Sequence, residues 1–210
     1  MRNLHTMRSI KSTVLATIVL ICLSIPLTAQ EDTGTETLFD QKDMFKNIGF
    51  VFAPSYSITS IDGYSTSILS LRGGVILNKK FTVGSFYNFS LNDIRPNSET
   101  VPGIHMDYQA GGGYIEYTIY SDKLIHFTFP LFIGGGEVGM DNEVGNLALG
   151  EQRFFMVEPS AMAEINLNKF VRFNLGAGYR IVNEMNYRNI NQSDISGFSG
   201  YIGIKIGLFK

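Results

Sequence analysis

Seven charged side chains lie at alternate positions within otherwise apolar segments, and their types suit two kinds of chemistry. They are Arg72, Glu116, Glu158, Glu164, Arg172, Arg180 and Lys205. Charged rings inside a pore select ions, whereas buried opposite charges inside a protein neutralise one another. The set holds four bases and three acids. This near balance favours a self-neutralising group of ion pairs over a conducting path.

Two histidines are the other candidates for chemistry. His126 shares one face of its segment with Thr128, and a histidine beside a hydroxyl can act as a general base. Threonine stands where a serine nucleophile is needed, so we predict instead a buried interior histidine opposite Thr118. His105 lies two residues from Asp107, and two residues do not make a metal site. The sequence therefore predicts no catalytic, metal-binding or cofactor-binding site, and no enzyme.

The first 29 residues have the pattern of a secretory signal. Three basic residues and no acid precede an apolar stretch over residues 14–23, and the small residue Ala29 stands before Gln30. The apolar stretch is too short to span a bilayer, so we expect the segment to be removed during export. Cys22 is the only cysteine and leaves with the signal, which excludes disulfides and cysteine-based sites from the exported protein.

The remaining chain is mildly acidic. Loss of Arg2, Arg8 and Lys11 takes the net charge from −2 to −5, which argues against a nucleic-acid partner. Residues 30–47 are polar and acidic without a sustained period, and we expect a flexible leader there. Residues 48–210 then form one predicted domain.

Eight segments with a period of two residues fill that domain. A tilted strand needs about 9 to 11 residues to cross a bilayer, and each segment has about that length. They cover residues 49–59, 67–77, 81–91, 111–120, 124–136, 154–166, 170–182 and 198–209. The period predicts an all-β fold, an eight-stranded antiparallel transmembrane barrel.

The links between these segments alternate in length. Residues 78–80, 121–123 and 167–169 make three-residue turns, whereas residues 60–66, 92–110, 137–153 and 183–197 make longer loops. Short turns at one rim and long loops at the other are typical of an up-and-down outer-membrane barrel. The turn at 167–169 also predicts a register that sets Glu164 directly opposite Arg172 as an ion pair.

The two faces of each segment differ in composition. One face has no charged residue and carries nine phenylalanines: Phe50, Phe52, Phe81, Phe89, Phe127, Phe129, Phe155, Phe173 and Phe198. The other face is rich in glycine, serine and threonine, and small residues suit the crowded inside of an eight-stranded barrel. We therefore predict that the apolar face meets lipid. The seven charges and His126 then form a polar network that fills the lumen and prevents general diffusion.

By strand count, loop alternation and ending, the chain resembles the small eight-stranded outer-membrane β-barrel family, which includes the OmpA membrane domain and OmpX. The ending alternates from Gly203 to Lys210 and closes on the aromatic Phe209, and it resembles the barrel-assembly signal of that family. Phe209 is penultimate here, and the chain has no tryptophan for the interfacial girdles. The resemblance implies location in the outer membrane of Gram-negative type. It also implies lipids, lipopolysaccharide and the barrel-assembly machinery as partners.

These expectations combine into a monomeric, porin-like outer-membrane protein that is structural or surface-interacting, with no general pore and no cofactor. Three alternatives stay open: an outer-membrane lipid-modifying enzyme, a narrow transporter of small or hydrophobic solutes, and a secreted lipocalin-like binding barrel. An enzyme would gather histidine, serine and an acid near the loop rim. A transporter would show a lateral opening or an open lumen, and a lipocalin-like barrel would turn its apolar face inward.

Overall fold

The computed structural model of the chain describes residues 48–98, 103–142 and 147–209. The predicted signal segment 1–29 and the predicted leader 30–47 lie outside the described residues. Among the described residues, no helix is long and apolar enough to cross a membrane.

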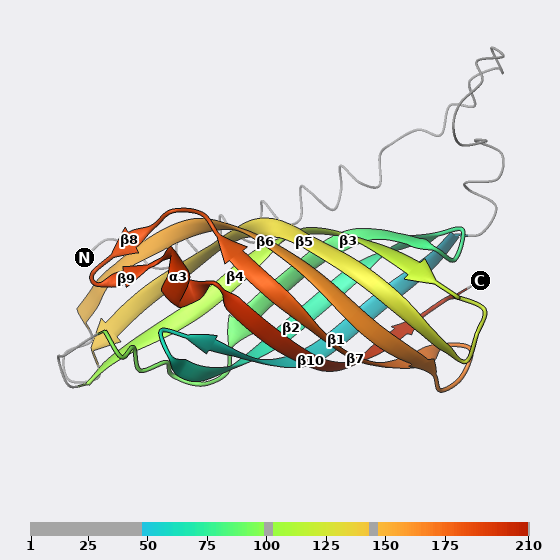
Figure 1. The fold of residues 1–210 in the computed structure, drawn as a ribbon, viewed down its shortest axis with the longest axis horizontal. Helices are drawn as coiled ribbons and strands as arrows, with labels where there is room; N and C mark the ends of the chain where they lie inside the picture. The colour runs from blue at the N-terminus through green and yellow to red at the C-terminus, as the bar shows by residue number, and fades with distance from the viewer. Residues whose placement is uncertain (1–47, 99–102, 143–146, 210) are drawn as a thin grey trace, which may run out of the picture. The chain divides into compact units, whose positions relative to one another are not determined.

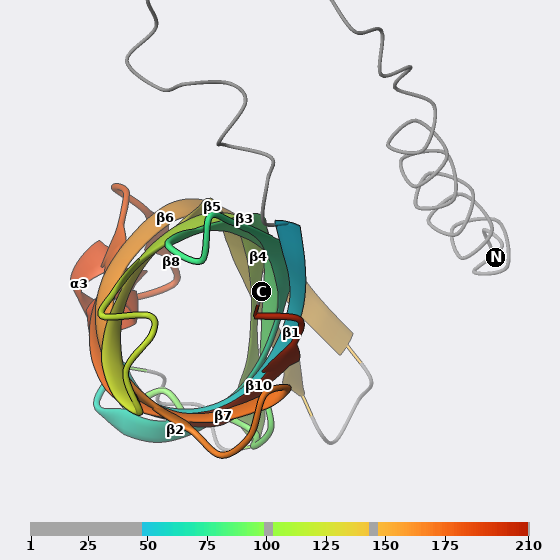
Figure 2. The same ribbon diagram turned by 90° about the vertical axis from the view of Figure 1, so that its right-hand side faces the viewer.

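The described residues form a closed barrel of eight strands, as the sequence predicts (Figure 1). The strands are β1 Ile48–Ile61, β2 Tyr64–Leu77, β3 Phe81–Ser90, β4 Ile104–Ile119, β5 Ile125–Asn142, β6 Leu147–Asn166, β7 Val171–Val182 and β10 Gly197–Gly207. Every neighbouring pair is antiparallel, and β10 closes the sheet by pairing with β1. Figure 2, which looks along the barrel, shows the ring that results.

Three strands extend beyond their predicted ends. β4, β5 and β6 have 16, 18 and 20 residues, so residues 104–110 of the loop expected at 92–110, and most of the loop expected at 137–153, are strand. β4 pairs with β5 from Ile104↔Asn142 to Ile119↔Phe127. Pairing between strands supplies the backbone hydrogen bonds here, which is why a polar, glycine-rich stretch continues as sheet beyond the apolar belt.

The link between β1 and β2 is a tight turn, so the prediction of a longer loop at 60–66 is wrong. Ile61 pairs with Tyr64, which leaves only Asp62 and Gly63 in the turn. Both have positive φ, at 47° and 73°, as a two-residue type I′ hairpin requires. Asp-Gly is a strong signal for this turn. The loop was predicted instead because the neighbouring residues are mostly serine and threonine, which are common in loops.

Two turns at the opposite rim shift the predicted register by two residues. Glu164 pairs with Asn174 rather than Arg172, and Thr118 pairs with Thr128 rather than His126. The side chain of Asn168 accepts hydrogen bonds from the backbone of residues 170 and 171, which widens the turn after β6. Because the shift is even, each side chain stays on its predicted face.

The segment from β7 to β10 carries three small elements at the loop rim. They are β8 Asn186–Tyr187, β9 Ile190–Asn191 and α3 Gln192–Ile195. The side chain of Asn191 accepts from the backbone of Ser193, and Asp194 accepts from the backbone of Asn191, which together cap α3. Ile190 and Ile195 are fully buried in the apolar core beneath.

The inside and the outside of the barrel differ as the sequence predicts. Exposed apolar side chains such as Phe50, Ile115 and Phe155 cover the outside. Inside, the half near the loop rim holds an apolar core that includes Phe86, Tyr108, Phe132, Phe154 and Met156. Most of the buried charged side chains lie in the half near the short turns. The apolar core inside the lumen was not expected from the sequence.

Candidate functional site

All eight residues of the predicted lumen network are buried inside the barrel. Six of them gather near the short-turn rim, where we call them the lower cluster: Arg72 on β2, Glu116 on β4, His126 on β5, Glu164 on β6, Arg172 on β7 and Lys205 on β10. Each stands at an inward position of its strand, since side chains alternate between the two faces of a sheet. Six strands therefore converge on one point of the lumen.

Lys205 joins the two carboxylates of the lower cluster. Its Nζ lies 2.7 Å from Glu116 Oε1 and also contacts the carboxylate of Glu164. Glu116 lies 3.9 Å from Arg72 Nη1 on its other side. A buried charge is stable only when such partners replace its water, and these four residues, each from a different strand, partner one another.

Glu164 is the centre of the lower cluster. Its Oε2 lies 3.0 Å from His126 Nε2 and 3.6 Å from Arg172 Nη1. The hydroxyl of Thr128 donates to Oε1 at 3.3 Å. The predicted ion pair between Glu164 and Arg172 is therefore present, although it runs diagonally across the ladder and not between directly opposed residues. His126 contributes by touching this carboxylate.

The two remaining network residues lie apart from the lower cluster, so the expected single network is divided in two. Glu158 accepts a hydrogen bond from the hydroxyl of Tyr201. The guanidinium of Arg180 donates to the backbone carbonyl of Ile195 at 2.8 Å and to Thr59 Oγ1 at 3.3 Å. Arg180 thus ties α3 to the inner wall instead of neutralising a carboxylate of the lower cluster.

The C-terminal aromatic lies against the lower cluster. The guanidinium of Arg172 is 3.6 Å from the centre of the Phe209 ring, a distance at which a cation and an aromatic face attract each other. Phe209 also borders a small cavity with Lys205 and Glu116. The outward residue at this end is Leu208, which is 40% exposed.

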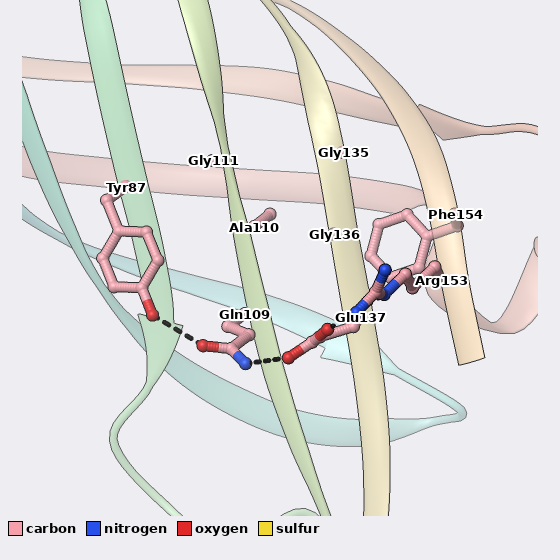
Figure 3. Close-up of a pocket in the computed structure, with 9 residues that line it drawn as sticks. All are labelled: Tyr87, Gln109, Ala110, Gly111, Gly135, Gly136, Glu137, Arg153 and Phe154. Atoms are coloured by element: carbon pink, nitrogen blue, oxygen red, sulfur yellow. Dashed lines mark hydrogen bonds and ion pairs between the residues drawn. The ribbon is translucent and has the colours of Figure 1, made fainter. Parts of the chain in front are cut away.

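A hollow that the sequence did not predict lies on the outer face of β3 to β6, toward the loop rim. It encloses about 360 Å³. Figure 3 shows four outward side chains along one side of it, one from each strand: Tyr87, Gln109, Glu137 and Arg153. Gln109, Glu137 and Arg153 lie in segments that the sequence predicts as loops. They point outward because β4, β5 and β6 extend beyond their predicted ends.

A chain of polar contacts links these four side chains. Tyr87 donates to Gln109 Oε1 at 2.6 Å, and the amide of Gln109 donates to Glu137. Arg153 Nε lies 3.5 Å from Glu137 Oε2. Below this row the outward positions of β4 and β5 are Gly111 and Gly135. Because these positions have no side chains, the hollow is open between the row and the apolar belt.

The surface between this row and the loop rim is acidic. Asp107 and Asp141 occupy outward positions of β4 and β5. Partial burial raises the pKa of the Asp107 carboxyl above its usual value, and repulsion from Asp141 and Asp93 adds to the rise. In the described residues, no group of three or more histidines, cysteines and acids is arranged to hold a metal ion.

Comparison with known proteins finds likeness in structure alone. No family model matches the chain, and no curated protein matches its sequence. Neisserial surface protein A matches with a TM-score of 0.56 at 10% identity, over 78% of this chain and 97% of that one. OprG from Pseudomonas aeruginosa gives a TM-score of 0.46 at 11% identity, over 80% and 99% of the two chains.

A major outer membrane protein from Thermus thermophilus also matches, with a TM-score of 0.48 at 9% identity over 77% of this chain and all of that one. Likeness at such low identity bears on the fold and not on activity. The closed ring of eight antiparallel strands, apolar outside, agrees with the match to Neisserial surface protein A. The chain therefore has the fold of the small eight-stranded outer-membrane β-barrel proteins.

Proposed function

We propose that the protein is an integral outer-membrane barrel, structural or surface-interacting, whose lumen admits no general diffusion. The observation that carries this proposal is the filling of the lumen at two levels. The lower cluster bridges six strands near the short turns, and the apolar core occupies the half near the loops. An eight-stranded barrel is just wide enough for side chains to fill its inside.

The outer surface supports the membrane location. Ile115, Phe127, Ile133 and Ile204 are between 43% and 54% exposed, and large apolar patches of this kind are unfavourable in water. Lipid also tolerates no unpaired strand edge, and the pairing of β1 with β10 leaves none in the barrel. The short turns then face the periplasm and the loop rim faces outward.

The geometry favours the alternatives less. A lipocalin-like barrel needs a polar outside, and here the exposed face is apolar. An enzyme of the outer leaflet needs its acid and base near the loop rim, whereas His126 and Glu164 meet in full burial near the short turns. For this reason we propose a role without catalysis. We also propose that the barrel acts as a monomer.

Two sets of partners follow from the proposal. Lipids, including lipopolysaccharide, would surround the apolar belt. The barrel-assembly machinery would recognise β10, whose outward side chains Ile202, Ile204 and Ile206 form the alternating apolar pattern of a final strand.

Fractionation and conductance measurements test this function. Cell fractionation should recover the protein in the outer membrane and require detergent for its extraction. The purified barrel in planar bilayers should show no stepwise open-pore current, and the double substitution Phe132→Ala and Phe154→Ala, which removes bulk from the apolar core alone, should still show none, because the lower cluster continues to fill the other half of the lumen. Recovery as a soluble periplasmic protein, or stable currents from the native barrel, would contradict the proposal.

A further inference from the structure

We propose that the small cavity beside the lower cluster, at the short-turn end of the lumen, binds a monatomic anion of the chloride type. Two buried cations, two threonines, one carboxylate and one exposed lysine contribute to its lining: Arg172, Lys205, Thr82, Thr118, Glu116 and Lys79. The cations supply the attraction, and the hydroxyl groups supply hydrogen bonds. This inference goes beyond the proposed function and does not require it.

The lower cluster carries one more positive charge than negative. Its cations are Arg72, Arg172 and Lys205, and the carboxylates that pair with them are Glu116 and Glu164. In the part of the chain that the structure describes, no third carboxylate pairs with these cations. His126 is neutral or positive, so it cannot reduce the surplus. Because a buried charge without compensation is costly, the surplus favours a bound anion.

Arg172 brings to the cavity a donor that the protein leaves unsatisfied. The residue is 7% exposed, and its Nη1 lies 3.6 Å from the carboxylate of Glu164. Its Nε is also buried, and this nitrogen has no hydrogen-bond partner among the described residues. A buried donor without a partner costs free energy. An anion in the adjoining cavity is the acceptor that this side of Arg172 lacks.

The carboxylate in the lining is already neutralised, so it does not exclude an anion. Glu116 Oε1 accepts a hydrogen bond from Lys205 Nζ at 2.7 Å, and its Oε2 lies 3.9 Å from Arg72 Nη1. The hydroxyl of Thr82 is 3.5 Å from Oε1, which is beyond the usual length of a hydrogen bond between oxygens. Thr82 can therefore turn its hydroxyl toward a better acceptor in the cavity.

Size and access restrict the ligand. The room at the centre of the cavity is about that of one water-sized sphere, which is too small for phosphate or sulfate. Lys79 is exposed in the short turn between β2 and β3, so an ion can enter from this rim. Its charge raises the concentration of anions at the mouth, and its flexible side chain can move aside for a halide slightly larger than water.

The linewidth of the chloride NMR signal, measured with the detergent-solubilised barrel, tests for binding. Chloride that exchanges with a protein site relaxes faster, so its resonance broadens with the fraction bound. We expect broadening that sodium bromide removes by competition and that sodium gluconate, at the same ionic strength, does not. Broadening no greater than in detergent alone, or equal effects of bromide and gluconate, would overturn the inference and leave the cavity to water.

Crystals of the barrel soaked in sodium bromide locate the ion by its anomalous scattering. We expect a bromide peak inside the cavity, within contact distance of Arg172, Lys205 and Thr118. Bromide peaks confined to the outer surface would contradict the site. A peak in the cavity without competition in the NMR measurement would mean binding at crystal concentration only, which also contradicts the proposal.

Two pairs of substitutions test the lining. Thr118→Val removes one hydroxyl at similar volume and should weaken chloride binding about tenfold, the worth of one hydrogen bond to a charged group. Thr66→Val is its control, because Thr66 is also buried but lies near the opposite rim. Lys79→Gln should weaken binding severalfold, whereas Lys80→Gln, at the next exposed position of the same turn, should change it less. Equal effects within either pair would contradict the assignment.

The two proposals fail in different ways. A protein that is inserted in the outer membrane and does not conduct, yet binds no halide, contradicts this inference alone. A protein that binds a halide in the cavity but fractionates outside the outer membrane contradicts the proposed function alone.

Discussion

Glu164 shows how a single carboxylate is kept charged inside the barrel. It is fully buried, and it contacts His126, Arg172 and Lys205, each from a different strand. Removing its charge would leave Arg172 without its carboxylate partner and Lys205 with Glu116 as its remaining one, in a place from which water is largely excluded. A buried ion pair is weak evidence for stability as such, but breaking one from a single side is costly.

We expect Glu164→Gln to lower the free energy of unfolding by about 3 to 5 kcal/mol, the usual effect of leaving a buried charge unpaired. Urea unfolding of the barrel in lipid vesicles measures the change. Glu151→Gln, at an exposed position of the same strand, serves as the control and should stay within about 0.5 kcal/mol. If both substitutions cost the same, the lower cluster is not held together by Glu164.

At the scale of the element, the β1–β2 hairpin depends on two residues with positive φ. Gly63 has a φ of 73°, a region that side chains with a Cβ adopt at a cost of about 1 to 2 kcal/mol. We expect Gly63→Ala to destabilise the barrel by that amount. Gly200→Ala is the matched control, because its added methyl meets no atom. Circular dichroism during thermal unfolding should show a lower midpoint for the first variant only.

Most strands and faces can be predicted from the sequence, because one apolar face meets lipid and the other does not. Faces survive the register errors at Thr118 and Glu164, since both errors are of two residues. The outer parts of β4, β5 and β6 were missed because they lie beyond the apolar belt, where hydropathy no longer alternates. The same stretches carry Gln109, Glu137 and Arg153, so the hollow that these residues line could not be predicted from the sequence either.

The expected lumen network shows a second limit of prediction. Alternation places Glu158 and Arg180 inside correctly, but it does not say how far along the barrel axis each one lies. Only the tilt and stagger of the strands decide that Arg180 meets the carbonyl of Ile195 and not the lower cluster. Likewise, α3 and the apolar core beneath it depend on how a polar loop folds back onto the rim.

At the scale of the whole molecule, the position of the apolar belt on the outer face predicts how the free-energy cost of an added charge varies with its depth in the membrane. Ile115 lies on the outer face of β4 between Gly111 and Ile119, and it is 54% exposed. Gln109, on the same face, lies in the polar row. An arginine near the bilayer midplane costs about 2 to 4 kcal/mol, and one near the interface costs about 0 to 1.

We therefore expect Ile115→Arg to be far more destabilising than Gln109→Arg when the barrel folds into lipid vesicles. The two variants carry the same added charge on the same strand, so their difference reports depth alone. Equal costs, measured by urea titration, would mean that the belt does not meet the acyl chains where the apolar outer face places it.

The two-residue offset of the β6–β7 turn has a consequence for fidelity during folding. A hairpin that slips by two residues keeps every side chain on its proper face, so neither lipid nor the lumen would reject it by hydrophobicity. Discrimination must come from the turn itself, where Asn168 holds the backbone, and from the meeting of Glu164 with Lys205 across the lumen. The buried charges therefore select the correct register, because a barrel misaligned by two residues keeps its side chains on the proper faces but separates these charge partners.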